Sequence, residues 1–189
     1  MTLIRTAGPA LEPITLAEAK AHLRLTHASE DELIGGLIRA AREDFERATR
    51  LCLIEQGWRL VLDAWPREGT ARIFRHPVRA VTAVTVYGYD GAPAALPASS
   101  YFVDRESRPA RIHLDAPPER GRALNGVEID FSAGFGESGP DVPDLPKRAI
   151  LMLVAHWYEM RGGFGPEDQP VSFPPAYERL IASQRLRRL

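Results

Sequence analysis

Residues 143–161 read PDLPKRAILMLVAHWYEMR, and this stretch decides the architecture of the chain. Between Ala149 and Tyr158, His156 is the one clearly polar side chain. A helix on the surface of a monomer normally has an apolar stripe and a polar back, but this helix would be apolar nearly all round. It is too short to cross a bilayer, which takes about 20 apolar residues. We therefore expect other helices or neighbouring subunits to cover it from several sides.

Two helices are predicted before this stretch. Thr15 and Glu18 have the spacing of a capping box ahead of a short helix of about two turns. Ser29 and Glu32 repeat that spacing ahead of a long amphipathic helix, which we expect to end near Arg50.

The middle of the chain has the two-residue period of β-strands. Apolar and polar residues alternate in short runs, and turn signals rich in Pro, Gly, Asn and Asp separate the runs. The predicted strands lie near residues 58–63, 72–74, 81–89, 101–104, 110–114 and 127–132. Short strands at this spacing indicate a small antiparallel sandwich or barrel.

Helices at both ends with strands between them predict an α+β fold. A helical bundle formed by the N- and C-terminal helices would carry a central antiparallel β insertion. The last helix is expected from Ala176 to about Arg185. We predict a single domain over residues 1–189, with N-terminal helices at 13–53, the β insertion at 54–136, and C-terminal helices and a tail at 143–189.

Composition excludes several classes of protein. A hydrophobic content of 44% with 26% charged residues is ordinary for a soluble globular protein. The net charge of -1 gives no electrostatic basis for tight binding to nucleic acid. The opening MTLIRTAGPALEP lacks the continuous apolar core of a signal peptide, and the single Cys52 cannot form an internal disulfide. We expect a cytosolic chain with a buried cysteine and no association with membranes.

One motif resembles a nucleotide fingerprint. Gly134, Gly136 and Gly139 spell G-x-G-x-x-G directly after a predicted strand. In a true fingerprint the glycines open the helix, so that its N-terminal amides meet the pyrophosphate. Prolines delay the helix here to about Asp144, so we interpret the motif as a glycine turn.

Acid–base chemistry has only weak candidates. His113 and Asp115 lie two apart on one strand, as do Glu128 and Asp130 on another, so a hydrolase using His113 with Asp115 or Asp130 is one alternative function. Alternation on a half-exposed sheet produces such pairs routinely, and a solvated face is favoured.

A metal site has one candidate pair, His156 and Glu159, one turn apart on the apolar helix. Their order reverses the Glu-x-x-His pattern of di-iron bundles, and no second pair exists. A histidine that is hydrogen-bonded within the bundle is therefore preferred. We predict no catalytic residues, no cofactor and no metal.

Several segments together resemble a known family. They are PITLAEAKAHLRL at 13–25, SEDELIGGLIRAAREDFERATR at 29–50, IEQGWRLVLDAWP at 54–66, VEIDFSAGFG at 127–136 and VPDLPKRAILMLVAHWYEMR at 142–161. In order and spacing they are similar to the head–tail connector, or adaptor, proteins of long-tailed phages and of phage-derived gene transfer agents.

The resemblance implies a structural protein without enzymatic activity. Such proteins form a ring beneath the portal protein, with twelvefold symmetry, and extend the channel through which DNA passes without sequence-specific binding. A tail-side stopper or completion protein docks on the opposite rim. The chain would assemble in the host cytoplasm and then reside in the virion or phage-like particle.

The family's C-terminal segment typically reaches toward the portal, which makes the basic tail the candidate portal contact. This candidate comprises Arg185, Leu186, Arg187, Arg188 and Leu189. From the residues alone, a solvated chain end is an equal interpretation of the tail.

The apolar helix supplies the candidate subunit contacts, which are Trp157, Tyr158 and Arg161. We expect one face of this helix to close the bundle and the rest to meet the loop after Gly162 or a neighbouring subunit. An alternative function is a ligand- or carbohydrate-binding β module with an oligomerising helical part.

Overall fold

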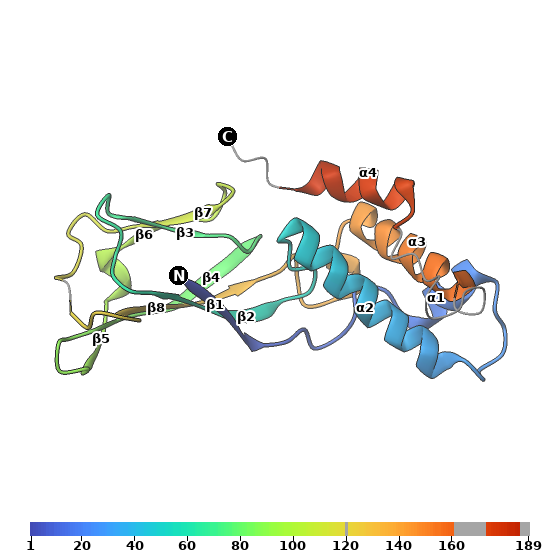
Figure 1. Cartoon of the computed structure of the whole chain (residues 1–189), viewed down its shortest axis with the longest axis horizontal. Helices are drawn as coiled ribbons and strands as arrows, with labels where there is room; N and C mark the ends of the chain where they lie inside the picture. The colour runs from blue at the N-terminus through green and yellow to red at the C-terminus, as the bar shows by residue number, and fades with distance from the viewer. Residues whose placement is uncertain (120, 161–172, 186–189) are drawn as a thin grey trace, which may run out of the picture. The chain divides into compact units, whose positions relative to one another are not determined.

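The computed structural model describes residues 1–119, 121–160 and 173–185. The chain divides into two compact units, one built from residues 1–9 and 55–135 and the other from residues 10–54 and 136–189. The first unit holds two antiparallel sheets and the second holds the helices (Figure 1). The predicted α+β class is confirmed.

A five-stranded sheet forms the larger part of the β unit. Its order is β1-β2-β8-β4-β5, and every neighbouring pair is antiparallel. Its strands are β1 (Thr2–Ala7), β2 (Gln56–Leu62), β4 (Val78–Tyr87), β5 (Pro93–Ala95) and β8 (Val127–Ala133).

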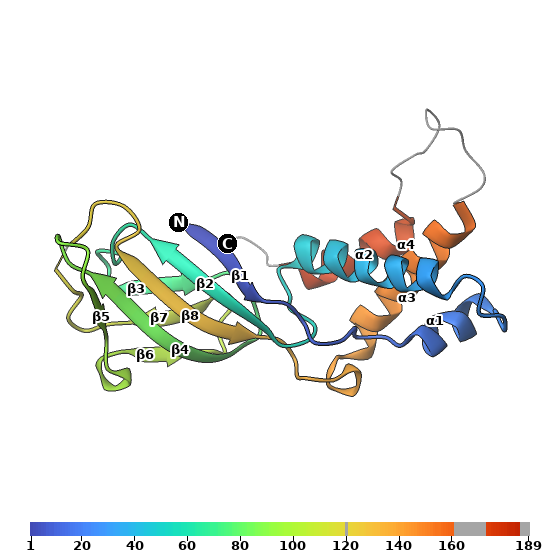
Figure 2. The same cartoon turned by 90° about the horizontal axis from the view of Figure 1, so that it is seen from below.

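A second, three-stranded sheet has the order β3-β7-β6. Its strands are β3 (Thr70–Ile73), β6 (Phe102–Asp104) and β7 (Ala110–His113), and a 3-10 turn at Ala98–Ser100 precedes β6. Figures 1 and 2 show this sheet lying over one face of the larger one. The strands of the described residues do not close into a barrel, so of the two predicted arrangements the barrel is not formed.

Alternation places the core of the β unit between the sheets. Trp58 and Leu60 on β2 and Ile129 and Phe131 on β8 are buried, and so is Ile112 on β7. Apart from the buried Val61, the intervening residues of these strands are more exposed, which is the pattern of a sheet with one covered face.

Two strands, β1 and β5, were not predicted. β1 consists of residues that favour strands, and it pairs with β2 in the register Thr2↔Val61 to Arg5↔Trp58. Its position brings the first residues of the chain into the β unit, which was predicted to occupy residues 54–136. The organisation as a single domain stays a prediction.

Four helices form the second unit. They are α1 (Leu16–Leu23), α2 (Asp31–Thr49), α3 (Asp144–Met160) and α4 (Pro175–Gln184), and a 3-10 turn at Gly139–Asp141 precedes α3. α3 contacts α1, α2 and α4. The segment 51–54, which follows α2, is fully buried and includes Cys52, as predicted.

The two predicted helix caps have different outcomes. The Thr15 hydroxyl accepts from the Glu18 amide at 3.1 Å, and the Thr15 amide donates to the Glu18 carboxylate at 2.6 Å, which confirms the capping box. The Ser29 cap is wrong. α2 begins one residue later than the pattern requires, with Glu30 at the cap position and no side-chain cap, and the Ser29 hydroxyl lies 2.8 Å from the ring of His27.

The close approach of β1 to β2 gives a test of the sheet. A Cβ on Gly57 would lie 2.8 Å from the Thr6 hydroxyl oxygen and 3.3 Å from the Ala7 amide nitrogen, so Gly57→Ala must push β1 outward. We expect a loss of about 1–3 kcal/mol in the free energy of unfolding, measured by urea denaturation. Gly8→Ala is the matched control, because its Cβ would meet nothing within 4 Å. Equal stability of the two variants would contradict the close packing of this edge.

Candidate interaction surfaces

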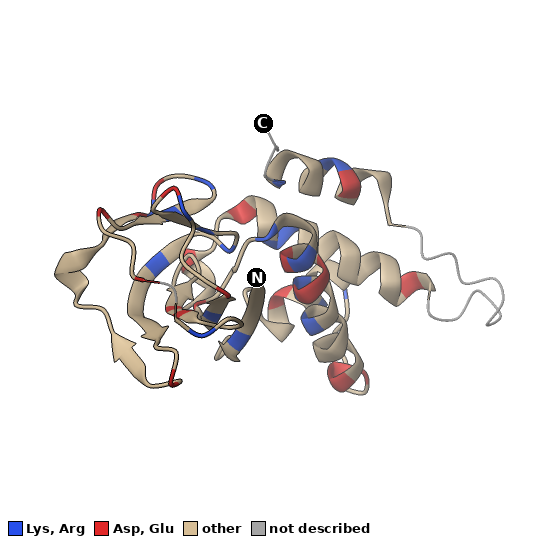
Figure 3. Ribbon diagram, turned by 60° about the vertical axis from the view of Figure 1, so that its left-hand side comes forward, with Lys and Arg blue, Asp and Glu red and all other residues tan. Residues whose placement is uncertain are grey.

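The apolar helix α3 is buried on one face only. Ala149, Ile150, Leu153 and Val154 are fully buried against the bundle, whereas the segment 155–158 is half-exposed. Between Arg148 and Glu159 the helix carries no Lys, Arg, Asp or Glu, and in Figure 3 it is the tan helix that runs into the grey segment. α3 therefore leaves an uncharged, half-exposed strip beside its buried face.

The predicted subunit contacts lie at the end of that strip. Trp157 and Tyr158 are half-exposed. The Tyr158 hydroxyl donates to the carboxylate of Glu30, the residue before α2, so it also fastens α3 to α2 within the chain. Arg161 lies outside the described residues.

A buried tyrosine attaches α4 to the bundle. The Tyr177 ring is fully buried and stacks on Phe173, and its hydroxyl donates to Asp44 of α2 at 2.7 Å. Burial, followed by the hydrogen bond to Asp44, raises the pKa of Tyr177, so the hydroxyl stays protonated and remains a donor. This contact joins residues 133 positions apart in the sequence, so no local pattern indicates it.

The predicted portal contact begins where α4 ends. Arg185 is exposed, and its amide donates to the Ile181 carbonyl at 3.0 Å. Leu186, Arg187, Arg188 and Leu189 lie outside the described residues. Since Tyr177 and Ile181 anchor α4, they also fix the point from which residue 185 leaves the bundle.

A buried ionic network lies on the other side of α2. The Arg42 guanidinium donates to Glu12 at 2.7 Å and to Glu46 at 3.0 Å, and its side chain is 4% exposed. Burial alone would lower the pKa of Arg42, but the hydrogen bond and charge of Glu12 and the charge of Glu46 outweigh it and raise the pKa. Glu46 also accepts from the Leu53 amide at 2.8 Å, so the network joins the segments before α1 and after α2.

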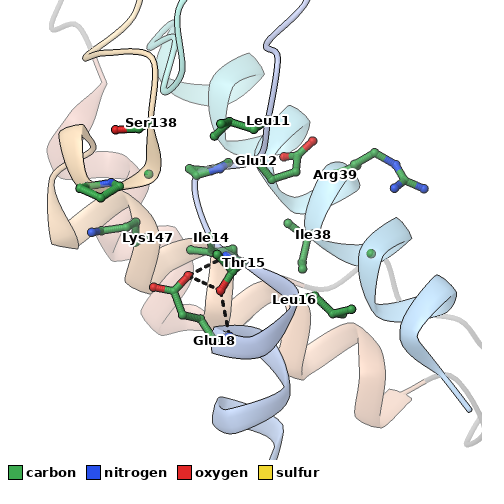
Figure 4. A pocket seen from close by; sticks show the side chains of 14 residues that line it. Leu11, Glu12, Ile14, Thr15, Leu16, Glu18, Ile38, Arg39, Ser138 and Lys147 are labelled. Atoms are coloured by element: carbon green, nitrogen blue, oxygen red, sulfur yellow. Dashed lines mark hydrogen bonds between the residues drawn. The ribbon is translucent and has the colours of Figure 1, made fainter. Parts of the chain in front are cut away.

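A pocket of about 870 Å³ opens next to this network, between the start of α1, α2 and the turn before α3 (Figure 4). Its apolar lining includes Leu11, Ile14 and Ile38, and Arg39 and Lys147 lie among its charged residues. The Glu18 carboxylate in its wall is engaged by Thr15, chiefly through the backbone amide, and these hydrogen bonds lower the pKa of Glu18. The acid in this wall therefore serves as a helix cap.

The predicted acid–base pairs take part in surface ion pairs. His113 Nε2 lies 3.4 Å from Asp115, whose side chain is fully exposed, and its Nδ1 lies 2.9 Å from the Thr70 hydroxyl. Glu128 and Asp130 both bind one cation on the neighbouring strand: Arg59 reaches Asp130 at 2.7 and 2.9 Å and Glu128 at 3.1 Å. Both carboxylates are therefore held in ion pairs with the same guanidinium.

The remaining sequence motifs form no chemical site. Gly134 directly follows β8. A Cβ on Gly136 would overlap the Asp141 side chain, so Gly136 makes room for the carboxylate that caps the turn before α3. Within the described residues, no group of three or more His, Cys, Asp or Glu side chains could hold a metal ion. None of the described helices combines the length and apolar character that a membrane crossing needs.

Among the described residues of the β unit, His76 is the one buried titratable group, with 2% of its surface exposed. Burial, with smaller contributions from Arg108 and Arg75, lowers the pKa of His76 from 6.5 to about 4. The Arg75 guanidinium lies 4.4 Å from the ring centroid of Trp58, so it is fixed close to the imidazole. His76 is consequently neutral in the fold above pH 4.

Comparison with known proteins agrees with the resemblance predicted from the sequence. Residues 13–94 match the family model described as phage gp6-like head-tail connector protein. No curated protein sequence matches the chain at a significant level.

Solved structures match over the whole chain. A chain in the virion of a native gene transfer agent particle is 28% identical with a TM-score of 0.82, and a chain in the neck of an empty particle, computed with C6 symmetry, is 29% identical with a TM-score of 0.80. A chain in the neck of the native particle, computed with C12 symmetry, is 28% identical with a TM-score of 0.79. Each alignment covers 100% of this chain and 97% of the other. The predicted resemblance to phage head–tail connector proteins is confirmed, and these matches support a structural connector.

The Tyr177 attachment gives a second testable prediction. Tyr177→Phe keeps the ring but leaves Asp44 without its donor, so we expect a loss of about 1.5–3 kcal/mol in the free energy of unfolding, the usual contribution of a hydrogen bond to a charged group. Tyr89→Phe, at a tyrosine that is 83% exposed, is the matched control. Chemical denaturation that gives equal stability for both variants would contradict the anchoring role.

A third prediction concerns pH and His76. The unfolded state binds a proton near pH 6.5 and the folded state only near pH 4, so stability is complete above 6.5 and falls as the pH drops toward 4, by up to about 3 kcal/mol. Denaturation at a series of pH values should show this loss for the natural protein and not for His76→Gln. His22→Gln, which removes an exposed histidine, should retain it. Parallel pH profiles for the natural protein and His76→Gln would refute the assignment.

Proposed function

We propose that this chain is a ring-forming head–tail connector subunit that joins a portal protein to the tail-side completion protein of a phage-like particle. The observation that carries the proposal is similarity over the full chain to subunits of particle necks computed with C6 and C12 symmetry. The connector family match over residues 13–94 points to the same function.

The helical unit has surfaces suited to a ring. A cyclic ring needs two different, complementary patches on each subunit. The half-exposed strip of α3, around Trp157, supplies an uncharged patch, and the outer face of α2 supplies a charged one with residues such as Arg39 and Glu43. The proposed ring contacts therefore come from the helices.

The charge of the chain suits a conduit for DNA. A channel lined densely with Lys and Arg would hold phosphates and release counterions, which strengthens binding. This chain has 24 basic and 25 acidic residues. In addition, the buried Arg42 and the half-exposed Arg59 are both paired with carboxylates. DNA would pass through such a ring without being held.

The proposed portal contact is the segment 185–189, which follows the anchored helix α4. Its four positions beyond Arg185 include two leucines and two arginines, a combination that can bind an apolar groove with an acidic rim. The proposed location is the head–tail junction of the particle, reached after assembly in the host cytoplasm.

The ring is tested by electron microscopy. Negative-stain images of the chain, alone and with its cognate portal protein, should show closed rings. A strict monomer that also fails to bind the portal protein would refute the proposed function.

The portal contact makes a fourth prediction. Deletion of residues 185–189 should abolish portal docking and leave the thermal unfolding midpoint unchanged, because Tyr177 and Ile181 still anchor α4. Co-sedimentation with portal measures docking, and Arg179→Ala, at an exposed basic residue on the same helix, serves as the control. Undiminished docking after the deletion would overturn the assignment of the tail.

A further inference from the structure

Strand β1 presents an open sheet edge. One side of β1 pairs with β2, and no other strand of the described residues pairs with its second side. Except for Leu3, which is half-buried, every residue of β1 is exposed, and Ile4 is 47% exposed. An unpaired edge leaves a row of backbone amides and carbonyls that a further strand can bind.

The other sheet edges are protected. β5 is three residues long and begins with Pro93, which lacks an amide proton. The residues of β4 that do not pair with β5 are irregular: their pairing with β8 shifts register at 78–80 and 81–83. In addition, the Arg105 guanidinium donates to the Arg79 carbonyl at 2.7 Å. β3 and β6, the edges of the smaller sheet, are four and three residues long. Short length, proline, bulges and caps are devices that prevent edge pairing.

β1 largely lacks these devices. Its six residues, TLIRTA, include no proline and one charge, Arg5, and the irregularity in its pairing with β2 lies at its end, between Arg5 and Ala7. Gly57 is shaped to receive β1, because a Cβ there would meet Thr6 and Ala7. The chain therefore fixes this strand in the sheet and leaves its other edge available.

We propose that the free edge of β1 binds an extended segment of a different neck protein, which adds a strand to the five-stranded sheet. This inference rests on the proposed connector function. Peptides bind exposed sheet edges in this way through main-chain hydrogen bonds, with specificity supplied by alternate side chains.

The edge determines the chemistry of the added strand. Leu3 and Arg5 share the face of their β2 partners Leu60 and Trp58, which are buried. Directly opposed side chains on one face contact each other. An apolar residue opposite Leu3 extends the core, and an acidic residue opposite Arg5 pairs with a guanidinium that forms no ion pair with the described residues.

Symmetry argues against a second copy as the occupant. In a cyclic ring every contact is heterologous, so β1 would have to meet a different edge of the neighbouring copy. The described edges other than β1 are the protected ones. A strand from another protein can pair with the free edge of β1 without needing a second unprotected edge on this chain.

Hydrogen exchange tests strand addition in the assembled particle. The amides of residues 2–7 that face away from β2 should exchange rapidly in the free chain and at least about tenfold more slowly in purified particles, since they gain hydrogen bonds. Equal exchange in both states overturns strand addition but leaves the connector function intact. Absence of the chain from the particles refutes the connector function itself.

Charge reversal tests the partner. Arg5→Glu should lower incorporation into particles by about tenfold, because an attraction becomes a repulsion, whereas Arg72→Glu, at an exposed arginine on β3, should not. Both variants are first checked for an unchanged thermal unfolding midpoint. Equal incorporation of the two variants overturns the acidic partner.

Cross-linking identifies the occupant. Cys52 is buried, so a maleimide photo-crosslinker reacts at the exposed position of Ile4→Cys. Mass spectrometry of irradiated particles should find an extended segment of another neck protein attached there. A cross-link to a second copy of this chain overturns the proposed occupant.

Discussion

The buried Arg42 guanidinium is the interaction on which the helical unit depends. A charge removed from water is tolerated only when it is paired and hydrogen-bonded. Glu12 and Glu46 each provide Arg42 with an ion pair and a hydrogen bond. The two acids come from different places: Glu12 precedes α1, and Glu46 lies on α2 and also holds the Leu53 amide. Burial of one cation therefore fixes the segments that lead into and out of the first two helices. The segment before α1 also lines the pocket beside that helix.

Local patterns predicted the elements well. The Thr15–Glu18 box and the alternation along β2 and β8 depend on residues a few positions apart, so their physical signals are visible in the sequence. The Ser29 cap failed because a matching spacing cannot say at which residue the helix begins. β1 was missed because its short run of strand-forming residues becomes a strand only by pairing with β2, which lies about fifty to sixty positions further along the chain.

The contacts that define the surfaces were beyond prediction for the same reason. Tyr177 and Asp44 are 133 positions apart, and Arg59 and Asp130 are 71 apart. No periodicity connects such residues; only the packed fold brings them together. The functional interpretation came instead from the order of several soft motifs, and the match over residues 13–94 with the full-length similarity to neck subunits supports it.

The chain passes from one unit to the other three times, after residues 9, 54 and 135, and this order affects how the protein can fold during synthesis. β1 is the first element to be synthesised, yet its partner strand begins at Gln56, after both N-terminal helices. α2 in turn packs against α3, which begins only at Asp144. Neither unit can complete its core from the residues made first. A nascent chain halted before residue 136 would hold an amphipathic helix without its apolar partner, and premature association with other copies is a hazard until translation passes that point.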